Sequence, residues 1–283
     1  MYFKINGKRY KFTPNKNTFK LLGAIVLIIL LVVLVRSCTK YNGKIRGADY
    51  EENFVNMPAY EYTPCVAPDG TPTCDYFSIY PPKDGDKVMH LTFDDGPSSN
   101  VTPQILDILK DNGVKATFFV LGSNAEKHPE IIKRIAREGH AIAIHSYSHD
   151  MKHIYSDVDN FIDEINKTRN TINSIVGENK CADVFRFPGG AFREERAEFK
   201  EVLLENNIPY VNWNCSTGDS ETQNPVSADL YNRAIRTANS SGRDSLVLLM
   251  HDAGSKQATA DSLPAIIKHF KDNGFRFDVI KRK

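Results

Sequence analysis

Ionisable side chains follow apolar runs of the sequence at several separate places. Asp94 and Asp95 come directly after the run 88–93, and His145 and His149 stand four residues apart after another run. Neighbouring strand residues point to opposite sides, so the two carboxylates are expected to have different roles. Two imidazoles and one carboxylate form the mixed nitrogen and oxygen set that suits Zn²⁺ and its neighbours in the first transition row. A set of three protein ligands leaves a coordination position open, which is typical of a catalytic metal site.

A buried cation and a further histidine add acid and base chemistry to this pattern. Arg186 lies in an apolar run, where it can pair with Asp94 and keep that carboxylate ionised; a surface salt bridge is the alternative. His251 ends another apolar run and is a candidate general acid. Asp219 is available to orient the ring of His251 and to raise its pKa.

Residues typical of turns surround several of these positions, so an ordinary turn without a catalytic role is an alternative interpretation. Gly189 and Gly190 leave the backbone bare, so an N–H there can approach a ligand oxygen, although an ordinary turn explains them nearly as well. Taken alone, Asp-Asp-Gly-Pro is typical of a turn, and a single H-x-x-x-H pair is weak evidence for a metal. The common position of these residues at the ends of apolar runs favours a site.

Seven short apolar runs alternate with helical patterns and must position these side chains. Helices are predicted from near Thr102, from Pro129, after Asp157 and around residues 263–270. Strands that alternate with helices predict a parallel α/β sheet, open or closed into a barrel, with the chemistry at the carboxyl ends of the strands. The predicted strands are 88–93, 116–121, 141–145, 184–187, 209–214, 245–250 and 275–280.

The ordered segments resemble a known family, the polysaccharide deacetylases of carbohydrate esterase family four, also called the NodB-homology domain. The resemblance covers residues 87 to 280 and implies a distorted (β/α) barrel of about seven strands that hydrolyses acetyl groups on sugar polymers with a metal ion. The matching segments are Thr92-Phe93-Asp94-Asp95-Gly96, His145-Ser146-x-x-His149, Arg186-x-Pro188-x-Gly190, Asp219 after Trp213, and Leu249-x-His251.

The resemblance also implies a role for each matching residue. Asp94 would be the general base, His251 the general acid, and the backbone N–H of Gly189 would face the developing oxyanion. The metal would be Zn²⁺, with Co²⁺, Ni²⁺ or Mn²⁺ as alternatives. The implied catalytic residues are Asp94, His251, Arg186 and Asp219, the implied metal ligands are Asp95, His145 and His149, and the implied substrate-binding residues are Gly189, Gly190, Trp213 and Leu249.

Two positions depart from the family pattern. The aromatic residue that commonly follows the fourth motif is replaced by Ser220, and Trp213 is expected to substitute for it in part. Many members carry an aromatic residue where this chain has Gly189, which predicts a locally wider substrate groove.

The pattern of the first 86 residues indicates a segment that attaches the protein to a membrane, with no catalytic motif. Residues 1–20 carry six basic residues and no acidic one, followed by fifteen apolar residues from Leu21 to Val35. At about 1.5 Å per residue this run is shorter than the bilayer core, so residues 21–36 fit either a transmembrane anchor, which we favour, or a cleaved signal segment. The basic flank is expected to stay in the cytoplasm, which places the Pro-rich stalk at 37–86 and the catalytic domain at 87–283 outside.

The five cysteines include no C-x-x-C motif. Outside the cell Cys65 and Cys74 form a candidate disulfide within the stalk. Cys181 and Cys215 are either a second pair or two small buried thiols, and we favour the thiols.

The composition and the expected location limit the classes of binding partner and substrate. The chain has 283 residues with 36 Lys and Arg against 35 Asp and Glu, a balance that gives no support to nucleic-acid binding. An anchored domain facing outward is expected to act on a cell-wall polysaccharide, with peptidoglycan as the expected polymer and N-acetylglucosamine or N-acetylmuramic acid as the target sugar. The alternatives are an O-acetyl esterase acting on xylan or another acetylated polymer and a non-catalytic carbohydrate-binding module.

Overall fold

The computed structural model describes residues 2–5, 8–11, 86–178 and 180–280. The chain divides into two compact units, Met1–Phe54 and Val55–Lys283. In the first unit the strands β1 (Tyr2–Ile5) and β2 (Lys8–Lys11) pair as an antiparallel hairpin, which the sequence analysis did not predict. The predicted anchor at 21–36, the stalk and the candidate disulfide between Cys65 and Cys74 lie outside the described residues. Within the described part of the chain, no helix combines the length and apolar character needed to cross a membrane.

The second unit contains a parallel sheet of seven strands, which confirms the predicted α/β class. The strands run in the spatial order β6-β5-β4-β3-β8-β7, and β9 pairs with the first residues of β3. All of these pairings are parallel. The strands are β3 (Lys87–Asp94), β4 (Thr117–Val120), β5 (Ala141–Ile144), β6 (Cys181–Phe185), β7 (Cys215–Ser216), β8 (Ser245–His251) and β9 (Phe275–Phe277).

The central strands β3 and β8 form the longest pairing of the sheet. Every residue of β3 after Lys87 is buried, including the polar His90, Thr92 and Asp94, as expected for a parallel strand that is covered on both faces. Its register with β8 runs from Val88 opposite Ser245 to Asp94 opposite His251. This register places two of the predicted catalytic residues beside each other at the carboxyl end of the sheet.

The fifth strand was predicted at 209–214, and this prediction is wrong, because the strand found here begins at Cys215. Only Cys215–Ser216 forms a strand, and the preceding segment forms a single bridge between Tyr210 and Phe185 of β6. Further along, Asn214 forms backbone and side-chain hydrogen bonds with β8, so its amide competes with the regular ladder. The segment thus joins the edge strand β6 to the opposite side of the sheet, which is consistent with a barrel-like arrangement.

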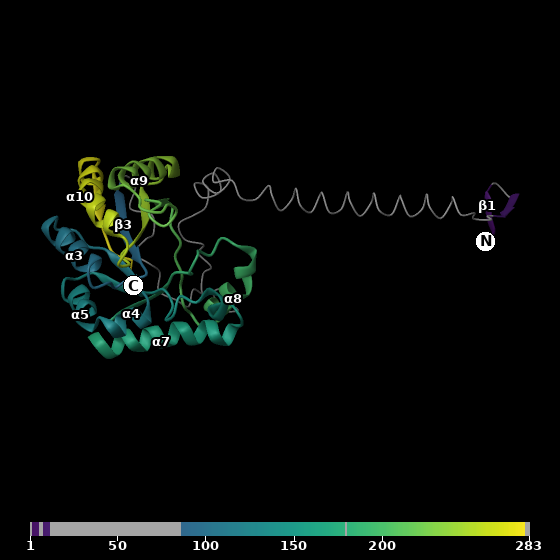
Figure 1. Cartoon of the computed structure of the whole chain (residues 1–283), viewed down its shortest axis with the longest axis horizontal. Coiled ribbons are helices and arrows are strands. Elements are labelled where there is room, and N and C mark those ends of the chain that lie inside the picture. Colours follow the sequence, from purple (N-terminus) through teal and green to yellow (C-terminus); the bar gives the residue numbers. More distant parts are fainter. Residues whose placement is uncertain (1, 6–7, 12–85, 179, 281–283) are drawn as a thin grey trace. The chain divides into compact units, whose positions relative to one another are not determined.

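Helices surround the sheet, and neighbouring helices contact one another in the order α9, α10, α3, α5, α7 and α8 (Figure 1). The four predicted helices are present, whereas α4, α6, α8 and α9 were not predicted. The buried residues of α9 include the small or polar Ala234, Thr237 and Ala238, which gives a weak apolar pattern. The helices are α3 (Val101–Asp111), α4 (Gly122–Lys127), α5 (Pro129–Arg137), α6 (Met151–Ile154), α7 (Val158–Val176), α8 (Ala197–Glu205), α9 (Ser227–Ser241) and α10 (Gln257–Asp272).

The second cysteine pair is excluded by the structure. Cys181 and Cys215 are both free, which confirms the two thiols that we favoured; Cys215 is buried as expected, whereas Cys181 is partly exposed. Burial raises the pKa of the Cys181 thiol to about 12, and it also raises the pKa of Cys215, so both thiols stay protonated and unreactive.

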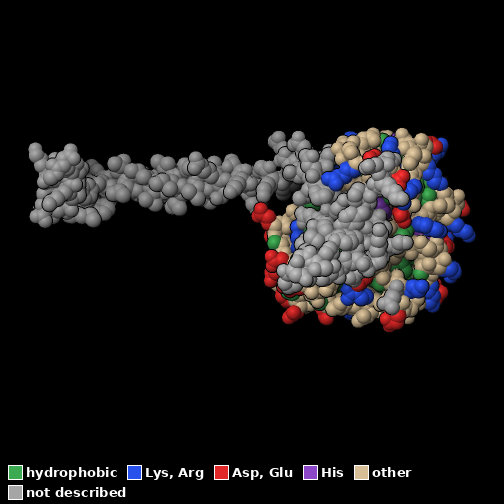
Figure 2. Space-filling model, turned by 180° about the vertical axis from the view of Figure 1, so that it is seen from behind, with side chains coloured by type: hydrophobic (Ala, Val, Ile, Leu, Met, Phe, Trp, Pro, Cys, Tyr) green, Lys and Arg blue, Asp and Glu red, His purple; other side chains and the backbone are tan. Residues whose placement is uncertain are grey.

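On the face shown in Figure 2, acidic side chains are more frequent along the left edge of the domain, and basic side chains are more frequent along the right edge, where acidic side chains lie among them.

Candidate active site

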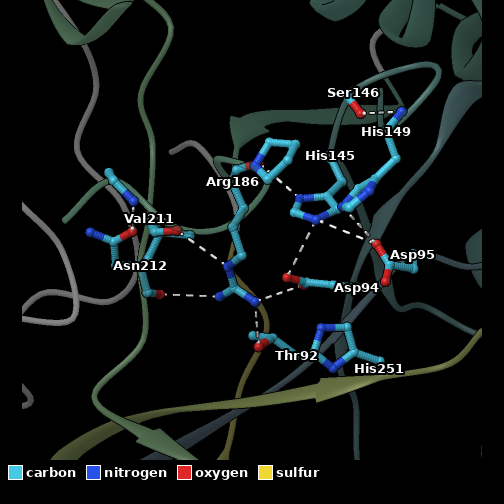
Figure 3. Close-up of polar contacts among 12 residues, drawn as sticks. Thr92, Asp94, Asp95, His145, Ser146, His149, Arg186, Val211, Asn212 and His251 are labelled. Carbon is cyan, nitrogen blue, oxygen red and sulfur yellow. Dashed lines mark hydrogen bonds and ion pairs between the residues drawn. The ribbon is translucent and has the colours of Figure 1, made fainter. Parts of the chain in front are cut away.

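The carboxyl ends of the strands bring the predicted ionisable residues to one edge of the sheet (Figure 3). Asp94 and His251 are the last residues of β3 and β8, which are neighbours. His145 and Arg186 come directly after β5 and β6, because each of these strands ends one residue earlier. The apolar strands therefore set the positions from which these polar side chains project.

Asp95, His145 and His149 form a cluster that could hold a metal ion. Their candidate ligand atoms all lie within 4.8 Å of one another. Oδ1 of Asp95 is 3.5 Å from Nε2 of His145 and 3.4 Å from Nε2 of His149. This arrangement joins a carboxylate and two imidazoles from two separate strand ends.

The hydrogen bonds around the cluster fit a metal ion. Nδ1 of His145 lies 2.9 Å from the backbone oxygen of Arg186, so Nδ1 carries the proton and the lone pair of Nε2 faces Asp95. Burial lowers the pKa of His145 to about 3, which keeps the ring neutral. Oδ1 of Asp95 is buried, and among the described residues it has no hydrogen-bond donor. Because a buried carboxylate oxygen without a partner is costly, a cation between these three residues would satisfy it.

The backbone at the cluster is strained at three residues that are not glycine. Asp95, Ser146 and His149 have φ values of 74°, 105° and 60°. Nδ2 of Asn124 donates to the backbone oxygen of Asp95 at 2.9 Å, and the N–H of His149 donates to Oγ of Ser146 at 3.1 Å. These hydrogen bonds compensate for the strain and hold the ligands in place.

Glu164 supports the loop between the two histidines and was not predicted from the sequence. Its Oε2 accepts hydrogen bonds from the backbone N–H groups of Tyr147 and Ser148, both at 2.7 Å. Glu164 belongs to α7 and is only 6% exposed. The one signal in the sequence is an acidic residue next to Ile165 on the apolar face of a helix, where an unpaired acid is rare.

Asp94 and Arg186 form a fully buried ion pair. Nη1 of Arg186 donates to Oδ1 of Asp94 and to Oγ1 of Thr92, both at 2.8 Å. The remaining nitrogens donate to the backbone oxygens of Val211 and Asn212 at 3.2 Å and 3.1 Å. Burial raises the pKa of the Asp94 carboxyl, and the Arg186 guanidinium opposes that rise. The proton affinity of Asp94 is thus set by these two opposed effects.

The second oxygen of Asp94 points towards the histidine cluster. Its Oδ2 is 3.8 Å from Nε2 of His145, which is too long for a hydrogen bond. Since Arg186 occupies Oδ1, Oδ2 is the oxygen available to accept a proton from a bound water.

His251 and Asp219 form a second charged pair on the other side of Asp94. Nδ1 of His251 is 2.8 Å from Oδ1 of Asp219, and the backbone N–H of His251 donates to Oδ2 at 2.8 Å. Thr259 donates to the same Oδ2 at 2.7 Å. Burial disfavours the charged imidazole, but Asp219 outweighs this effect and raises the pKa of His251 to about 9. The ring is therefore protonated at neutral pH, and its Nε2–H is available as an acid.

Asp252 is a further buried acid that the sequence analysis missed. Its Oδ2 accepts a hydrogen bond from Oγ1 of Thr102 at 2.6 Å, and its backbone oxygen accepts one from Oγ of Ser98 at 2.6 Å. Its backbone N–H donates to the oxygen of Asp94 at 3.1 Å. Burial raises the pKa of Asp252 to about 7. Asp252 thereby ties the segment after β3 to the end of β8.

The predicted substrate-binding residues differ in how accessible they are. Gly189 and Gly190 have φ values of 75° and 78° and belong to a turn. The turn that the sequence analysis gave as an alternative is therefore present, and it does not exclude a backbone N–H that approaches a ligand. Leu249 and Trp213 are only 7% and 6% exposed, so each offers a small surface to a ligand.

Met151 limits the wider groove expected at Gly189. A Cβ atom at Gly189 would lie 3.0 Å from the terminal methyl of Met151. Met151 begins α6, directly after the histidine loop, so its methyl occupies part of the space left by the missing side chain.

Several known proteins are similar to this chain in sequence. The sequence profile named polysaccharide deacetylase matches residues 82–208. A peptidoglycan-N-acetylglucosamine deacetylase of Bacillus cereus is 39% identical over 189 residues, which are 66% of this chain and 64% of that protein. Another Bacillus cereus protein of the same name is 30% identical over 200 residues, or 68% of this chain and 85% of the relative.

A solved structure agrees with these matches. The structure of a Streptococcus mutans CE4 esterase is 35% identical, covers 69% of this chain and 87% of its own, and has a TM-score of 0.63. The chain spans less than two thirds of the first Bacillus cereus relative, but most of the second relative and of the solved structure. The chain therefore belongs to the polysaccharide deacetylase family.

Proposed function

We propose that this protein hydrolyses the N-acetyl groups of N-acetylglucosamine or N-acetylmuramic acid residues in peptidoglycan and releases acetate. The observation that carries the proposal is the buried Asp94–Arg186 pair, which lies between a three-ligand cluster and the His251–Asp219 pair. Amide hydrolysis needs a base, an oxyanion donor and an acid for a poor leaving group, and this edge of the sheet offers all three. The names of the Bacillus cereus relatives support peptidoglycan as the polymer.

A divalent cation would be held by Asp95, His145 and His149, with Zn²⁺ expected from the ligand types and Co²⁺, Ni²⁺ or Mn²⁺ as alternatives. When bound, such an ion lowers the pKa of a coordinated water and polarises the acetyl carbonyl. Two features fit this ion: Oδ1 of Asp95 has no hydrogen-bond donor among the described residues, and the proton of His145 lies on Nδ1, which leaves Nε2 to bind a metal.

The remaining steps follow from the side chains. Oδ2 of Asp94 accepts a proton from the water that attacks the acetyl carbon, while Arg186 holds Oδ1. The N–H of Gly189 donates to the oxyanion that forms. Nε2 of protonated His251 then gives its proton to the amide nitrogen as the C–N bond breaks, which releases acetate and leaves a free amine on the sugar. Asp94 loses its proton to solvent, and His251 takes one up, which restores the starting state.

The cell-surface location is part of the proposal and rests on the sequence alone. The basic segment 1–20 and the apolar run 21–35 support a single-pass membrane anchor at residues 21–36 with the catalytic domain outside, facing the wall.

An O-acetyl esterase is the second candidate, since the solved Streptococcus mutans structure carries the name esterase. An alkoxide leaves more readily than an amide anion, so an esterase would depend less on His251. Parallel assays on acetylated xylan and on N-acetylglucosamine oligomers separate the two candidates. Replacing His251 with Gln should abolish amide hydrolysis and spare most of an esterase activity.

Mass spectrometry of peptidoglycan fragments tests the proposal directly. The full chain, loaded with Zn²⁺, is incubated with purified fragments, and each sugar is analysed for loss of an acetyl group. We expect the loss on one sugar type, and the Asp94→Asn variant should bind the metal but show no loss. Intact acetyl groups on both sugars after exposure to the wild-type chain would overturn the proposal.

A further inference from the structure

The side chain of Tyr155 reaches the loop that contains the predicted oxyanion donor. Tyr155 follows α6, and its hydroxyl donates a hydrogen bond to the backbone oxygen of Pro188 at 2.9 Å. This oxygen belongs to the same peptide unit as the N–H of Gly189. In a planar trans peptide the C=O and N–H bonds point in opposite directions. The hydrogen bond from Tyr155 therefore also fixes the direction of the Gly189 N–H.

We propose that Tyr155 is a positioning residue that holds and polarises the oxyanion donor of this enzyme. The inference rests on the proposed function, because it assigns to the Gly189 N–H the task of stabilising the tetrahedral intermediate. Tyr155 acts through the peptide unit and does not itself contact the reacting atoms.

The N–H of Gly189 is free to serve a ligand. The next N–H, that of Gly190, donates to the oxygen of Phe187 at 2.8 Å and closes the turn. Across residues 86–178 and 180–280, no acceptor is found for the N–H of Gly189. Both glycines have positive φ, a backbone conformation that other residues rarely adopt. This conformation sets the direction of the Gly189 N–H.

Tyr155 is held rigidly, as a positioning residue must be. The guanidinium carbon of Arg196 lies 3.2 Å from the centre of its ring, and the ring of Phe199 packs edge-on at 5.2 Å. Burial raises the pKa of the Tyr155 hydroxyl, so the group stays protonated and remains a donor. Removal of the hydroxyl alone would leave these ring contacts in place.

The position of α6 explains why one tyrosine can serve this purpose. The helix starts two residues after the candidate metal ligand His149 and carries Met151 at its first position. Met151 lies against Gly189, and Tyr155 binds the preceding carbonyl, so both contacts come from one short segment. This segment connects the metal cluster to the oxyanion donor.

The size of the effect follows from the cooperativity of hydrogen bonds through one peptide unit. A hydrogen bond to the carbonyl strengthens the donor at the other end of the same amide by about 10–30%. An oxyanion donor contributes about 10²–10³ in kcat, so the loss of this support should lower kcat by about twofold to eightfold. KM should stay nearly constant, because the oxyanion exists only in the transition state and the intermediate.

The test compares Tyr155→Phe with Tyr231→Phe in the full, Zn²⁺-loaded chain. Tyr231 is a matched control, because its hydroxyl pairs with His269 at 3.3 Å on the α9 and α10 side of the domain. The steady-state rates on N-acetylglucosamine oligomers give kcat and KM, and a chelator competition gives the Zn²⁺ affinity. We expect a lower kcat with unchanged KM and unchanged Zn²⁺ affinity for Tyr155→Phe and wild-type values for Tyr231→Phe. An unchanged kcat, or a fall in kcat accompanied by an equal loss of Zn²⁺ affinity, would overturn the inference.

A second measurement is independent of turnover. The amide ¹⁵N and ¹H resonances of Gly189 report on the hydrogen bond at the preceding carbonyl, and Tyr155→Phe should shift both upfield. If the wild-type chain releases no acetate from any sugar, the proposed function fails, while the Gly189 resonance still decides whether Tyr155 controls this peptide unit. An unshifted Gly189 resonance would refute the positioning role whatever the activity.

Discussion

Replacing Arg186 with Met should both destabilise the domain and disable its base. Arg186 is 0% exposed and Asp94 is 2% exposed, so the variant leaves a buried carboxylate without its counter-charge. Removing one partner of such a pair costs about 3–5 kcal/mol of unfolding free energy. With a urea m-value of about 2 kcal/mol/M, the unfolding midpoint should fall by about 1.5–2.5 M. The backbone oxygens of Val211 and Asn212 lose their donors as well, which adds to the cost.

The same substitution has a signature in the pH profile. Burial already raises the pKa of Asp94, and Arg186 is the largest influence that lowers it. Without Arg186 the pKa of Asp94 should rise further, so the base becomes protonated at higher pH. The acid limb of kcat/KM should therefore move to higher pH, and activity at neutral pH should fall steeply.

A double-mutant cycle separates the ion pair from general damage to the core. Asp94→Asn leaves the guanidinium unpaired, whereas the double variant removes both charges. We expect the double variant to be more stable than the sum of the single losses by about 2 kcal/mol or more. Arg169→Met is a matched control, because its 2.6 Å pair with Asp183 is partly exposed and should contribute at most about 1 kcal/mol. Single losses that add to within about 0.5 kcal/mol, or an Arg186→Met loss no larger than that of the control, would refute the reasoning.

Two further predictions concern the general acid and the metal ligands. In Asp219→Asn, burial acts on His251 without the carboxylate that raises its pKa to about 9. Because the acid is active only when protonated, the alkaline limb of kcat/KM should move down to about pH 6.5 or lower, with a loss of at least about 30-fold at pH 8. An unmoved limb would exclude His251 as the acid. Glu164→Ala should weaken Zn²⁺ binding by about 10- to 100-fold in a chelator competition, because the loop between the histidines loses two hydrogen bonds. The exposed Glu130→Ala serves as its control, and equal Zn²⁺ affinities in the two variants would contradict a supporting role for Glu164.

The ionisable residues of the site could be predicted because a few simple rules relate the sequence of a parallel sheet to its structure. Apolar runs buried on both faces identify β3 and β8, and the carboxyl ends of parallel strands share one edge. Asp94 and His251 come at those ends, so their proximity follows from the strand assignment alone. The family resemblance supplied their roles, which apolar patterning does not contain.

The supporting residues could not be predicted in this way because their contacts depend on how each helix and loop sits along the sheet. The periodicity of α7 places Glu164 on the buried face, but it does not show which loop the carboxylate meets. Tyr155 directly follows α6, a helix of four residues that periodicity does not predict, and its hydroxyl bonds the backbone oxygen of Pro188. The segment 209–214 reads as a strand by composition, yet the side chain of Asn214 competes for the backbone of β8.

The strained backbone explains why these supports are needed. Asp95, Ser146 and His149 each adopt a positive φ, at a cost of about 1–3 kcal/mol per residue that the surroundings must offset. Asn124 bonds the backbone of Asp95, and Glu164 bonds the two residues between Ser146 and His149, so both loops are held by helices outside them. These are hydrogen bonds within the protein, and they act on the ligands whether or not an ion is bound. We therefore expect the affinity of the cluster for a metal ion to depend on the contacts that α4 and α7 make with the two loops, as well as on the three candidate ligand side chains.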